Sequence, residues 1–447
     1  MRYSVISQGL PLLDVEAKVR LYGGKDIRPA PLSGQVFCEL DPDKAVLLAR
    51  EPGLAVRPVH GISLRQSEIP LAGAVTLPRS PVEDPARRRL SVRSGMVFSP
   101  VYAAAQTALS TLFYDFRTMF DPPVTGAGFT IAVLDSGVRK THLGIKDKVV
   151  YEANFSDSPT AEDVFDHGTG VAYLAAGGRH GPGEDAGMAP GAALMNLKVI
   201  GDNGQGSSED VTAGLERAMD LAQGYPPGNP MHPDLVNLSF GSPDSGDPLD
   251  PVRVAARAAV SRGLWVIAAA GNSGPGTGSV GSPASDPQVF AAGAMTFDPW
   301  DIWEGSSRGP TKEGNVKPDL VFYGVNILTA SARGDTAYTL KAGTSFAAPA
   351  ASGMVAVVNE GYLRWLGRPY SQAEAWTALP WITRKPPGQA LGKDNTYGYG
   401  MPMGDLVGGM FRPKGVDMSS VLNAVPSLLG LGLMAAMVGM VTKGGRK

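Results

Sequence analysis

Cysteine is almost absent from this sequence. Cys38 is the one cysteine among 447 residues, so the chain can form no intramolecular disulfide. A lone cysteine in an apolar stretch is expected to be a small buried hydrophobe, and a cysteine nucleophile is not expected. An excess of charge is also lacking, because 40 Lys and Arg nearly balance 42 Asp and Glu. The formal charge of −2 gives no argument for nucleic-acid binding.

The two ends of the sequence differ in apolar content. Residues 1–14 lack an unbroken apolar run followed by small residues, so no secretory signal is expected and localisation stays unassigned. Residues 424–441 form an uncharged run rich in Leu and Met, interrupted by three glycines and Pro426. The run only just reaches the length of a membrane span. It is compatible with a membrane anchor and with a helix packed on a partner or on the protein itself.

Glycine and proline are abundant, with 57 and 37 residues, and hydrophobic residues make up 43% of the chain. This composition is typical of many tight loops around a buried α/β core. A chain of 447 residues exceeds one typical core. We therefore expect one large domain with appendages.

The first hundred residues divide into two parts. Strand, helix and strand are predicted over 35–40, 41–48 and 54–59, which is a small βαβ unit. From His60 to Met96 the sequence has several arginines and prolines and little periodicity, so an exposed linker is predicted. Its run Arg87-Arg88-Arg89 fits either a solvated segment or a protease-sensitive junction.

Strands and helices alternate after an amphipathic stretch at 101–119, and no internal repeat is visible. Unbroken apolar strands indicate a mostly parallel sheet that is covered on both faces. The predicted strands are 129–134, 194–199, 235–240 and 264–270, and the predicted helices are 168–176, 208–222 and 252–262.

Ser345 lies in a loop of small residues, 341–349, that leads directly into an alanine-rich helix. The helix N-terminus supplies free N–H groups and a partial positive charge, which favour the oxyanion formed when a serine attacks an acyl carbon. A serine at this place is also an ordinary helix cap. Nucleophilic chemistry needs a base and a group that orients the base.

Both partners can be found where predicted strands end or helices begin. Asp135 ends one strand and could orient a histidine, His167 opens a helix, and Asn272 follows a strand and could donate to an oxyanion. Singly, they fit a turn former, a helix cap and a left-handed turn residue. Jointly, four glycine-flanked polar residues favour a catalytic site. His142 is interpreted as structural.

These residues stand in motifs that resemble those of the subtilisin-like serine proteases, the subtilase family. The resemblance covers residues 97–405 and keeps the family's order of aspartate, histidine and serine. Its motifs are Asp-Ser-Gly at Asp135, His-Gly-Thr-Gly-Val-Ala at His167, Ala-Ala-Gly-Asn at Asn272 and Gly-Thr-Ser-Phe-Ala-Ala-Pro around Ser345.

The resemblance implies a fold and a domain organisation. It implies an α/β, subtilisin-like three-layer fold with a mostly parallel central sheet over 96–405. A small α+β, ferredoxin-like propeptide domain and linker would occupy 1–95, and a tail 406–447. The propeptide would assist folding, block the cleft and be removed by the enzyme itself.

The resemblance also implies an activity, that of a serine endopeptidase acting on polypeptide substrates. Asp135, His167 and Ser345 would form the triad, and Asn272 and the backbone N–H of Ser345 the oxyanion hole. Substrate would pair with the segment Ser239, Phe240 and Gly241. Ala270 and Gly271 would wall the main pocket, and Ser273 in place of an acid favours large apolar or broad specificity there.

Some features limit the resemblance. Gly170 replaces the second histidine of many relatives, and Phe322-Tyr323-Gly324 replaces the usual Ala-Pro-Gly near the nucleophile. The chemistry needs no cofactor. Relatives often bind structural calcium, but no Asp-rich loop is spaced to supply its oxygens.

Two other functions remain open. A catalytically inactive binding module would be expected to lack one of the four residues. A non-peptide acyl hydrolase of the doubly wound type would carry Gly-x-Ser-x-Gly with the histidine last.

Overall fold

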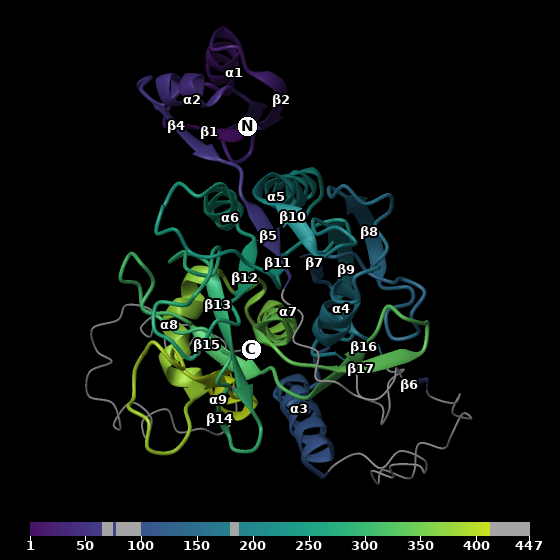
Figure 1. Cartoon of the computed structure of the whole chain (residues 1–447). Coiled ribbons are helices and arrows are strands. Elements are labelled where there is room, and N and C mark those ends of the chain that lie inside the picture. Colours follow the sequence, from purple (N-terminus) through teal and green to yellow (C-terminus); the bar gives the residue numbers. More distant parts are fainter. Residues whose placement is uncertain (65–74, 77–99, 179–186, 412–447) are drawn as a thin grey trace, which may run out of the picture.

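The computed structural model describes residues 1–64, 75–76, 100–178 and 187–411. A small N-terminal unit, residues 1–58, stands beside a large α/β unit, and the chain leaves the small unit through β5 (Gly61–Ser63) (Figure 1). Each unit has its own buried apolar side chains. The predicted boundary at residue 95 lies outside the described residues.

The N-terminal unit is a four-stranded antiparallel sheet in the order β2-β3-β1-β4. The chain path β-α-β-β-α-β is the ferredoxin-like arrangement. Strands over 35–40 and 54–59 and the helix between them are confirmed, and Cys38 is fully buried as expected. The elements are β1 (Arg2–Ser7), α1 (Leu12–Leu21), β2 (Lys25–Ala30), β3 (Gln35–Glu39), α2 (Pro42–Leu48) and β4 (Leu54–Pro58).

The large unit is built on an eight-stranded sheet with the path β14-β13-β12-β11-β7-β9-β8, on which β15 pairs with β13. Its pairs are parallel except that of β13 with β14. The strands are β7 (Thr130–Asp135), β8 (Val149–Asn154), β9 (Ala193–Lys198), β11 (Leu235–Leu238), β12 (Trp265–Ala269), β13 (Phe290–Thr296), β14 (Asp301–Ile302) and β15 (Leu320–Tyr323).

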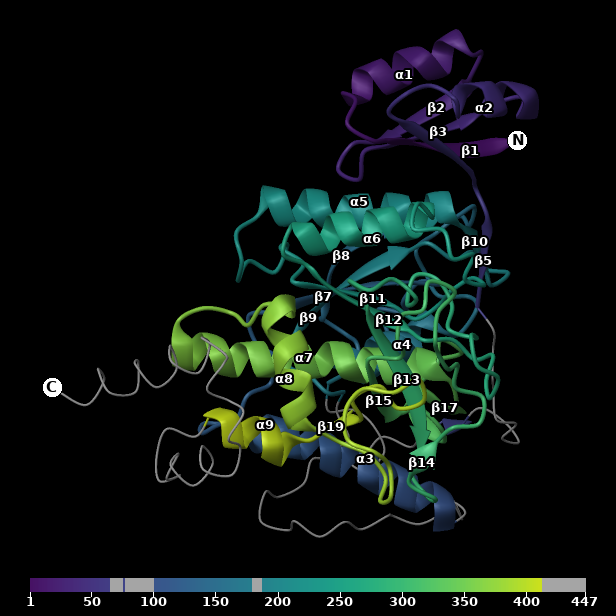
Figure 2. The ribbon, with the colours of Figure 1, turned by 90° about the vertical axis from the view of Figure 1, so that its left-hand side faces the viewer.

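Helices cover both faces of this sheet (Figure 2). Ile131 and Val133 of β7 point into one apolar cluster, and Ala132 and Leu134 point into the other. Because successive side chains of a strand face opposite sides, a strand that is covered twice must be apolar throughout. The first cluster lies against α4 (Gly168–Ala176), α7 (Thr344–Leu366) and α8 (Gln372–Ile382), and the second against α5 (Ser208–Gly224) and α6 (Pro251–Ser261). The three-layer α/β fold is confirmed.

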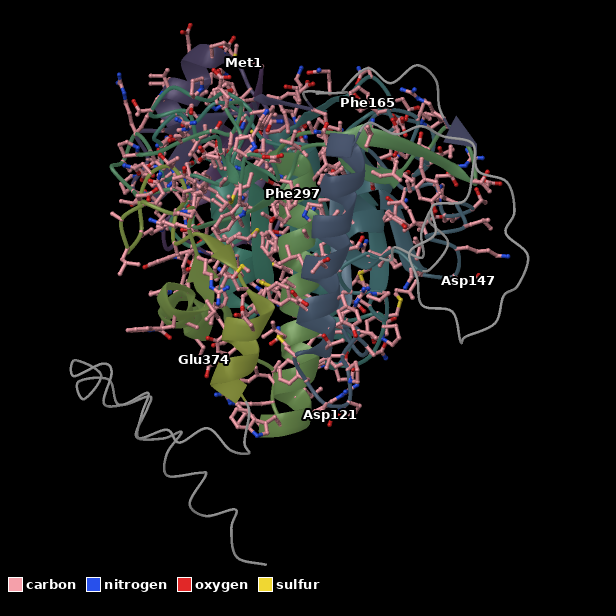
Figure 3. All side chains as sticks on the ribbon, turned by 90° about the horizontal axis from the view of Figure 1, so that it is seen from below. Met1, Asp121, Asp147, Phe165, Phe297 and Glu374 are labelled. Atoms are coloured by element: carbon pink, nitrogen blue, oxygen red, sulfur yellow. The ribbon has the colours of Figure 1, made fainter. Side chains whose placement is uncertain are left out.

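Shorter elements complete the large unit. Helix α3 (Pro100–Thr118) lies alongside α7, as the view from below shows (Figure 3), and it also contacts α9 (Gly404–Phe411). The hairpin β16 (Ile327–Ala330) and β17 (Ala337–Lys341) pairs with β6 (Val75–Thr76). Strand β18 (Thr383–Arg384) pairs with β19 (Met401–Pro402).

The linker prediction is wrong for its first residues. Strand β5 pairs with β10 (Gln205–Ser207) of the large unit, and Ile62 is only 1% exposed. A segment of three residues is too short to show a strand period. Its partner strand lies about 140 residues away, so the neighbouring sequence does not reveal the pairing. The arginine run 87–89 lies outside the described residues.

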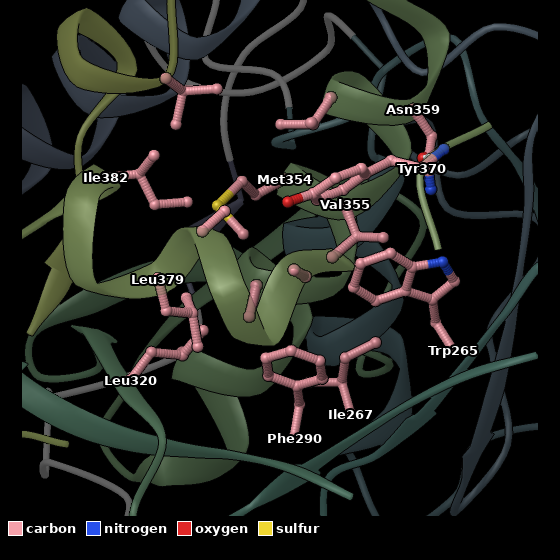
Figure 4. Close-up of a pocket in the computed structure, with 15 residues that line it drawn as sticks. Trp265, Ile267, Phe290, Leu320, Met354, Val355, Asn359, Tyr370, Leu379 and Ile382 are labelled. Carbon is pink, nitrogen blue, oxygen red and sulfur yellow. Dashed lines mark hydrogen bonds between the residues drawn. The ribbon is translucent and has the colours of Figure 1, made fainter. Parts of the chain in front are cut away.

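An enclosed apolar pocket of about 40 Å³ lies between the sheet, α7 and α8 (Figure 4). Trp265 and Phe290, near the amino ends of β12 and β13, line it together with Met354 and Leu379. The polar group of Asn359 is occupied, since its amide oxygen accepts from Tyr370 N at 2.6 Å. The pocket is therefore a packing void at the edge of the sheet opposite to the carboxyl ends.

The membrane prediction concerned residues 424–441, which lie outside the described residues. Within the described ranges, no helix combines the length and the apolar composition that crossing a bilayer requires.

Candidate active site

The predicted site residues gather at the carboxyl edge of the parallel sheet. Asp135 ends β7, Ser239 follows β11, and Asn272 follows β12. β7 and β11 are neighbours, and the chain builds the sheet outward from them in both directions. This is the topological switch point, where open α/β sheets leave a crevice.

Asp135 and His167 are in direct contact. The Nδ1 atom of His167 lies 2.8 Å from Oδ1 of Asp135, and both side chains are almost fully buried, at 2% and 0% exposure. Asp135 Oδ1 also accepts from Ser136 N at 2.7 Å. A carboxylate at Nδ1 fixes the tautomer that leaves Nε2 as the acceptor.

His167 stands at the N-cap position of α4 but does not cap the helix with its side chain. Asp163 takes that role, since its Oδ2 accepts from Thr169 N at 2.8 Å while its Oδ1 accepts from Ser136 Oγ at 2.8 Å. Burial raises the pKa of Asp163, although the hydrogen bonds from Thr169 and Ser136 work in the opposite direction. Asp163 thus ties the histidine loop to the end of β7.

The two glycines beside His167 serve close backbone packing. A Cβ at Gly168 would meet the Gly137 carbonyl oxygen at 2.2 Å, and a Cβ at Gly170 would meet Thr329 Cγ2 at 2.8 Å. Thr329 also donates from Oγ1 to the Gly170 carbonyl at 2.7 Å. The second histidine of many relatives therefore has no room here, because β16 fills its place.

Ser345 lies in the first turn of α7, after a sharp turn at Gly343. Gly343 has φ of 143°, which favours glycine, and its N–H donates to the Gly324 carbonyl at 2.7 Å. The segment Phe322-Tyr323-Gly324 thus contacts the turn that precedes Ser345. Ser345 Oγ donates to the Ser239 carbonyl at 2.8 Å, so the serine does not cap the helix.

Pro349 helps to fix this arrangement. It stands four residues after Ser345 and lacks the N–H that a helix would direct to the Ser345 carbonyl. That carbonyl accepts from Ser239 Oγ at 2.9 Å instead. Two reciprocal hydrogen bonds thus join Ser239 and Ser345.

The side chains of His167 and Ser345 make no hydrogen bond to each other in the described part of the chain. The rings of His167 and Phe346, the residue after Ser345, have centroids 5.3 Å apart. His167 Nε2 is buried and has no hydrogen-bond partner among the described residues. Catalytic hydrogen bonds are often long or poorly aligned without substrate, so the missing bond is no argument against a pairing of these two residues.

Asn272 is oriented by Thr344. Its Oδ1 accepts from both the N–H and the Oγ1 of Thr344, at 2.9 Å each. The amide NH₂, a donor, therefore lies at the other end of the group. The non-glycine residues with positive φ in the described ranges are Asp26, Asp147, Asp166 and Asn326, so Asn272 is not a left-handed turn residue.

The predicted substrate segment carries an extended strand. Ser63 forms an antiparallel bridge with Gly241, and Leu64 N donates to the Gly204 carbonyl at 3.0 Å. Phe240, between Ser239 and Gly241 in the sequence, is buried. Ala270 and Gly271 lie beside this region, where Gly271 N donates to Thr344 Oγ1 at 3.1 Å.

Sequence reasoning missed several residues that support the site. Asp163, Thr344 and Lys341 are polar and buried, but each acts on a partner distant in the sequence or hidden within a motif. A local signal existed for Asp163, which lies only four residues before His167. His142 is structural as expected, because its Nε2 lies 2.8 Å from the Ala337 carbonyl and burial lowers its pKa.

A metal site was not predicted from the sequence. In the ranges that the structure describes, no three His, Cys, Asp or Glu side chains come together to hold an ion. The resemblance leaves structural calcium open, and the described residues add no support for it.

The fold and the site define an α/β protein of the serine-hydrolase type, with its polar residues in the order Asp, His, Ser. The sequence model of the subtilase family, peptidase family S8, matches residues 126–400, more than half of the chain. The chain belongs to the subtilase family. Since this is a family of serine-type endopeptidases, the predicted enzyme class is confirmed at family level.

Individual relatives are similar over the same region. Serine protease AprX of Bacillus subtilis (strain 168) is 32% identical over 53% of this chain and 58% of the relative. M-protease of Shouchella clausii (strain KSM-K16) is 32% identical over 62% of this chain and 63% of the relative. Subtilisin Savinase of Lederbergia lenta is 32% identical over 62% of this chain and 90% of the relative. The chain thus spans about three fifths of the first two.

Proposed function

We propose that this chain is a serine endopeptidase that is made as a self-processing zymogen. The observation that carries the proposal is the buried hydrogen bond of 2.8 Å between Asp135 and His167 beside a serine at a helix start. A buried carboxylate that orients a histidine next to a hydroxyl is the arrangement that activates a serine.

In the proposed reaction, Ser345 Oγ forms a bond to the carbonyl carbon of the scissile peptide, and His167 Nε2 takes its proton. Asn272 donates to the oxyanion. When the peptide C–N bond breaks, His167 passes the proton to the leaving amine. Water then attacks the acyl-enzyme with the same proton transfers, which releases the acid and restores Ser345. Asp135 stabilises the charged imidazolium throughout.

The N-terminal unit would be the inhibitory propeptide. It docks on α5 and α6, where Glu216 accepts from Leu32 N and Ser33 N at 2.8 and 2.6 Å. Arg2 pairs with Glu209 at 2.5 Å, and Arg57 pairs with Asp247. Strand β5 then fills the place where an extended substrate would pair, which supports a zymogen whose cleft is blocked by its own chain.

The register of β5 suggests where the chain is cut. Ser63 lies opposite Gly241 in an antiparallel bridge, and in such a register two residues further along one strand correspond to two residues back on the other, which here is Ser239. Ser345 donates to the carbonyl of that same Ser239. We therefore expect cleavage of the bond after Arg65, which lies outside the described residues. An arginine there would point to broad rather than purely apolar specificity.

The two alternatives have less support. The four expected residues are present and in contact with one another or with immediate neighbours, which argues against an inactive binding module. The segment that occupies the cleft is a peptide strand held by main-chain hydrogen bonds, which favours peptide over other acyl substrates. Polypeptides and the chain's own propeptide are thus the proposed partners.

The test is reaction with a fluorophosphonate probe followed by peptide mapping. We expect the label on Ser345, loss of label in Ser345→Ala, and hydrolysis of a casein substrate that declines with labelling. A chain that is folded, freed of its first 65 residues and still unlabelled would contradict the proposal.

A further inference from the structure

The proposed base and nucleophile stand on separate segments of the large unit. His167 precedes α4 and Ser345 lies in α7, and the described residues contain no hydrogen bond between their side chains. Proton transfer needs Oγ and Nε2 within hydrogen-bond reach when the hydroxyl turns toward the ring. Other contacts must therefore hold the two segments at the right separation.

A buried lysine joins the two segments. Lys341 is the last residue of β17, four residues before Ser345, and is 2% exposed. Its Nζ donates to the backbone carbonyl of Asp166 at 2.9 Å and lies 3.6 Å from Asp166 Oδ2. Asp166 immediately precedes His167. One side chain from the nucleophile segment thus binds the residue next to the base.

Asp166 is held in an unusual conformation. Its φ is 68°, in the left-handed region that a non-glycine residue adopts only at a cost in free energy. Its buried carboxylate accepts from Ser331 Oγ at 2.9 Å and Ala332 N at 2.6 Å, and pairs with Arg333 at 3.1 Å. These contacts over-determine the backbone at Asp166, which in turn sets the direction in which His167 leaves it.

We propose that Lys341 and Asp166 are positioning residues for the catalytic reaction. They act through the backbone of Asp166, whose carbonyl Lys341 holds, and so fix His167 Nε2 relative to Ser345 Oγ. Separating the two segments would break this hydrogen bond of a buried ammonium group, and this cost opposes their separation. The inference rests on the proposed function, because it assigns a role within that reaction.

The same unit contains a matched pair at the other edge of the sheet. Lys317 is 1% exposed, and its Nζ donates to the Val289 carbonyl at 2.6 Å and to Asp319 Oδ2 at 2.7 Å. Val289 and Asp319 precede β13 and β15, at the amino ends of those strands. Lys317 makes the same kind of contact as Lys341 but far from the candidate site. Lys317 is therefore the control that distinguishes a positioning role of Lys341 from a purely structural role.

The experiment compares Lys341→Met, Lys317→Met and wild type in the full chain. Each protein is brought to the same processing state, checked by intact mass, and labelled with a fluorophosphonate well below its Tm. We expect Lys341→Met to lower kinact about 10- to 100-fold with KI nearly unchanged, because a small misplacement of the base slows the chemical step. Lys317→Met should lose a similar amount of Tm and keep kinact within about three-fold.

A second variant keeps the test decisive if Lys341→Met does not fold. Asp166→Asn tolerates the left-handed backbone and keeps the carbonyl, but removes the charge that faces Lys341. We expect it to lower kinact about 3- to 10-fold. Wild-type kinact in whichever of these variants folds, or an equal loss in Lys317→Met, would overturn the positioning role. If wild type itself does not react, the proposed function fails instead.

Discussion

Two glutamate side chains, Glu360 and Glu216, accept hydrogen bonds from backbone N–H groups in different parts of this molecule. Glu360, on α7 and 4% exposed, accepts from the N–H groups of Thr125, Gly126 and Ala127 at 2.6, 2.7 and 3.0 Å. Glu216, on α5 and half-buried, accepts from two N–H groups of the N-terminal unit. Glu360 thus joins two segments within the large unit, whereas Glu216 joins the large unit to the N-terminal unit.

The difference lies in what surrounds each carboxylate. Glu360 is enclosed beside the apolar cluster that packs α7 on the sheet. Glu216 belongs to the seam, the contact surface formed by Leu32, Ser33 and Arg57 with Glu216 and Asp247. When the seam opens, water can form the hydrogen bonds that its polar groups lose. Water cannot in the same way compensate for the loss of packing around a buried group in a core. The N-terminal unit is thus attached in a way that permits release.

The largest effect should come from Glu360. In a Ser345→Ala background that prevents self-digestion, Glu360→Ala removes the acceptor of the buried Gly126 N–H and of the partly buried N–H groups of Thr125 and Ala127. We expect a loss of about 3–5 kcal/mol in the free energy of unfolding, measured with guanidinium chloride. A loss under about 1 kcal/mol would contradict the contrast between core and seam.

Glu216→Ala in the same background should act on the seam alone. We expect amide hydrogens of β5 and of residues 32–33 to exchange about 10- to 100-fold faster, which corresponds to the loss of charged hydrogen bonds. The free energy of global unfolding should change little. Glu360→Ala is the matched control, since it should show the opposite pattern. Unchanged exchange at β5 would mean that Glu216 does not hold the N-terminal unit.

The packing of Gly170 against Thr329, close to His167, offers a second test of how tightly the core is built. Gly170→Ala places a Cβ against Thr329 Cγ2, and we expect a loss of about 1–2 kcal/mol. Adding Thr329→Ser removes that methyl group but keeps the hydroxyl that bonds the Gly170 carbonyl, so part of the loss should return. A double variant no more stable than Gly170→Ala would show that the contact is not the cause.

The smallest effect concerns pH. Burial lowers the pKa of His142, so the unfolded chain binds a proton more readily than the native protein. Its contribution to stability is complete above the unfolded pKa of about 6.5 and is lost as the pH falls below it. His142→Gln should flatten the pH dependence of unfolding below about pH 6.5. His60→Gln, on the chain leaving the N-terminal unit, serves as control, and an unaltered slope in His142→Gln would contradict the assignment.

The candidate site could be predicted because its signals are local. Asp135, His167, Asn272 and Ser345 each stand where an apolar strand ends or an apolar helix begins, next to glycines that such turns require. The central strands were recognisable because coverage on both faces makes them apolar throughout. The N-terminal elements β1, α1 and β2 lacked such runs and were not predicted.

The remaining parts depend on partners that are distant in the sequence. Lys341 holds the Asp166 carbonyl across 175 residues, and Glu360 holds Gly126 across 234. Residues 61–63 form a strand through their pairing with β10, and because that pairing leaves no local signal the sequence predicts a linker there. A single sequence carries no signal for such pairs, because neither member is unusual in its own neighbourhood.

The most direct test of the zymogen proposal is intact mass and N-terminal sequencing after expression of wild type and Ser345→Ala. The chain weighs 46.6 kDa over 447 residues, so loss of the first 65 removes about 7 kDa. We expect wild type to lose that mass and begin at Gln66, while Ser345→Ala stays intact. Processing of Ser345→Ala at the same bond, or no processing of either protein, would contradict self-cleavage by this site.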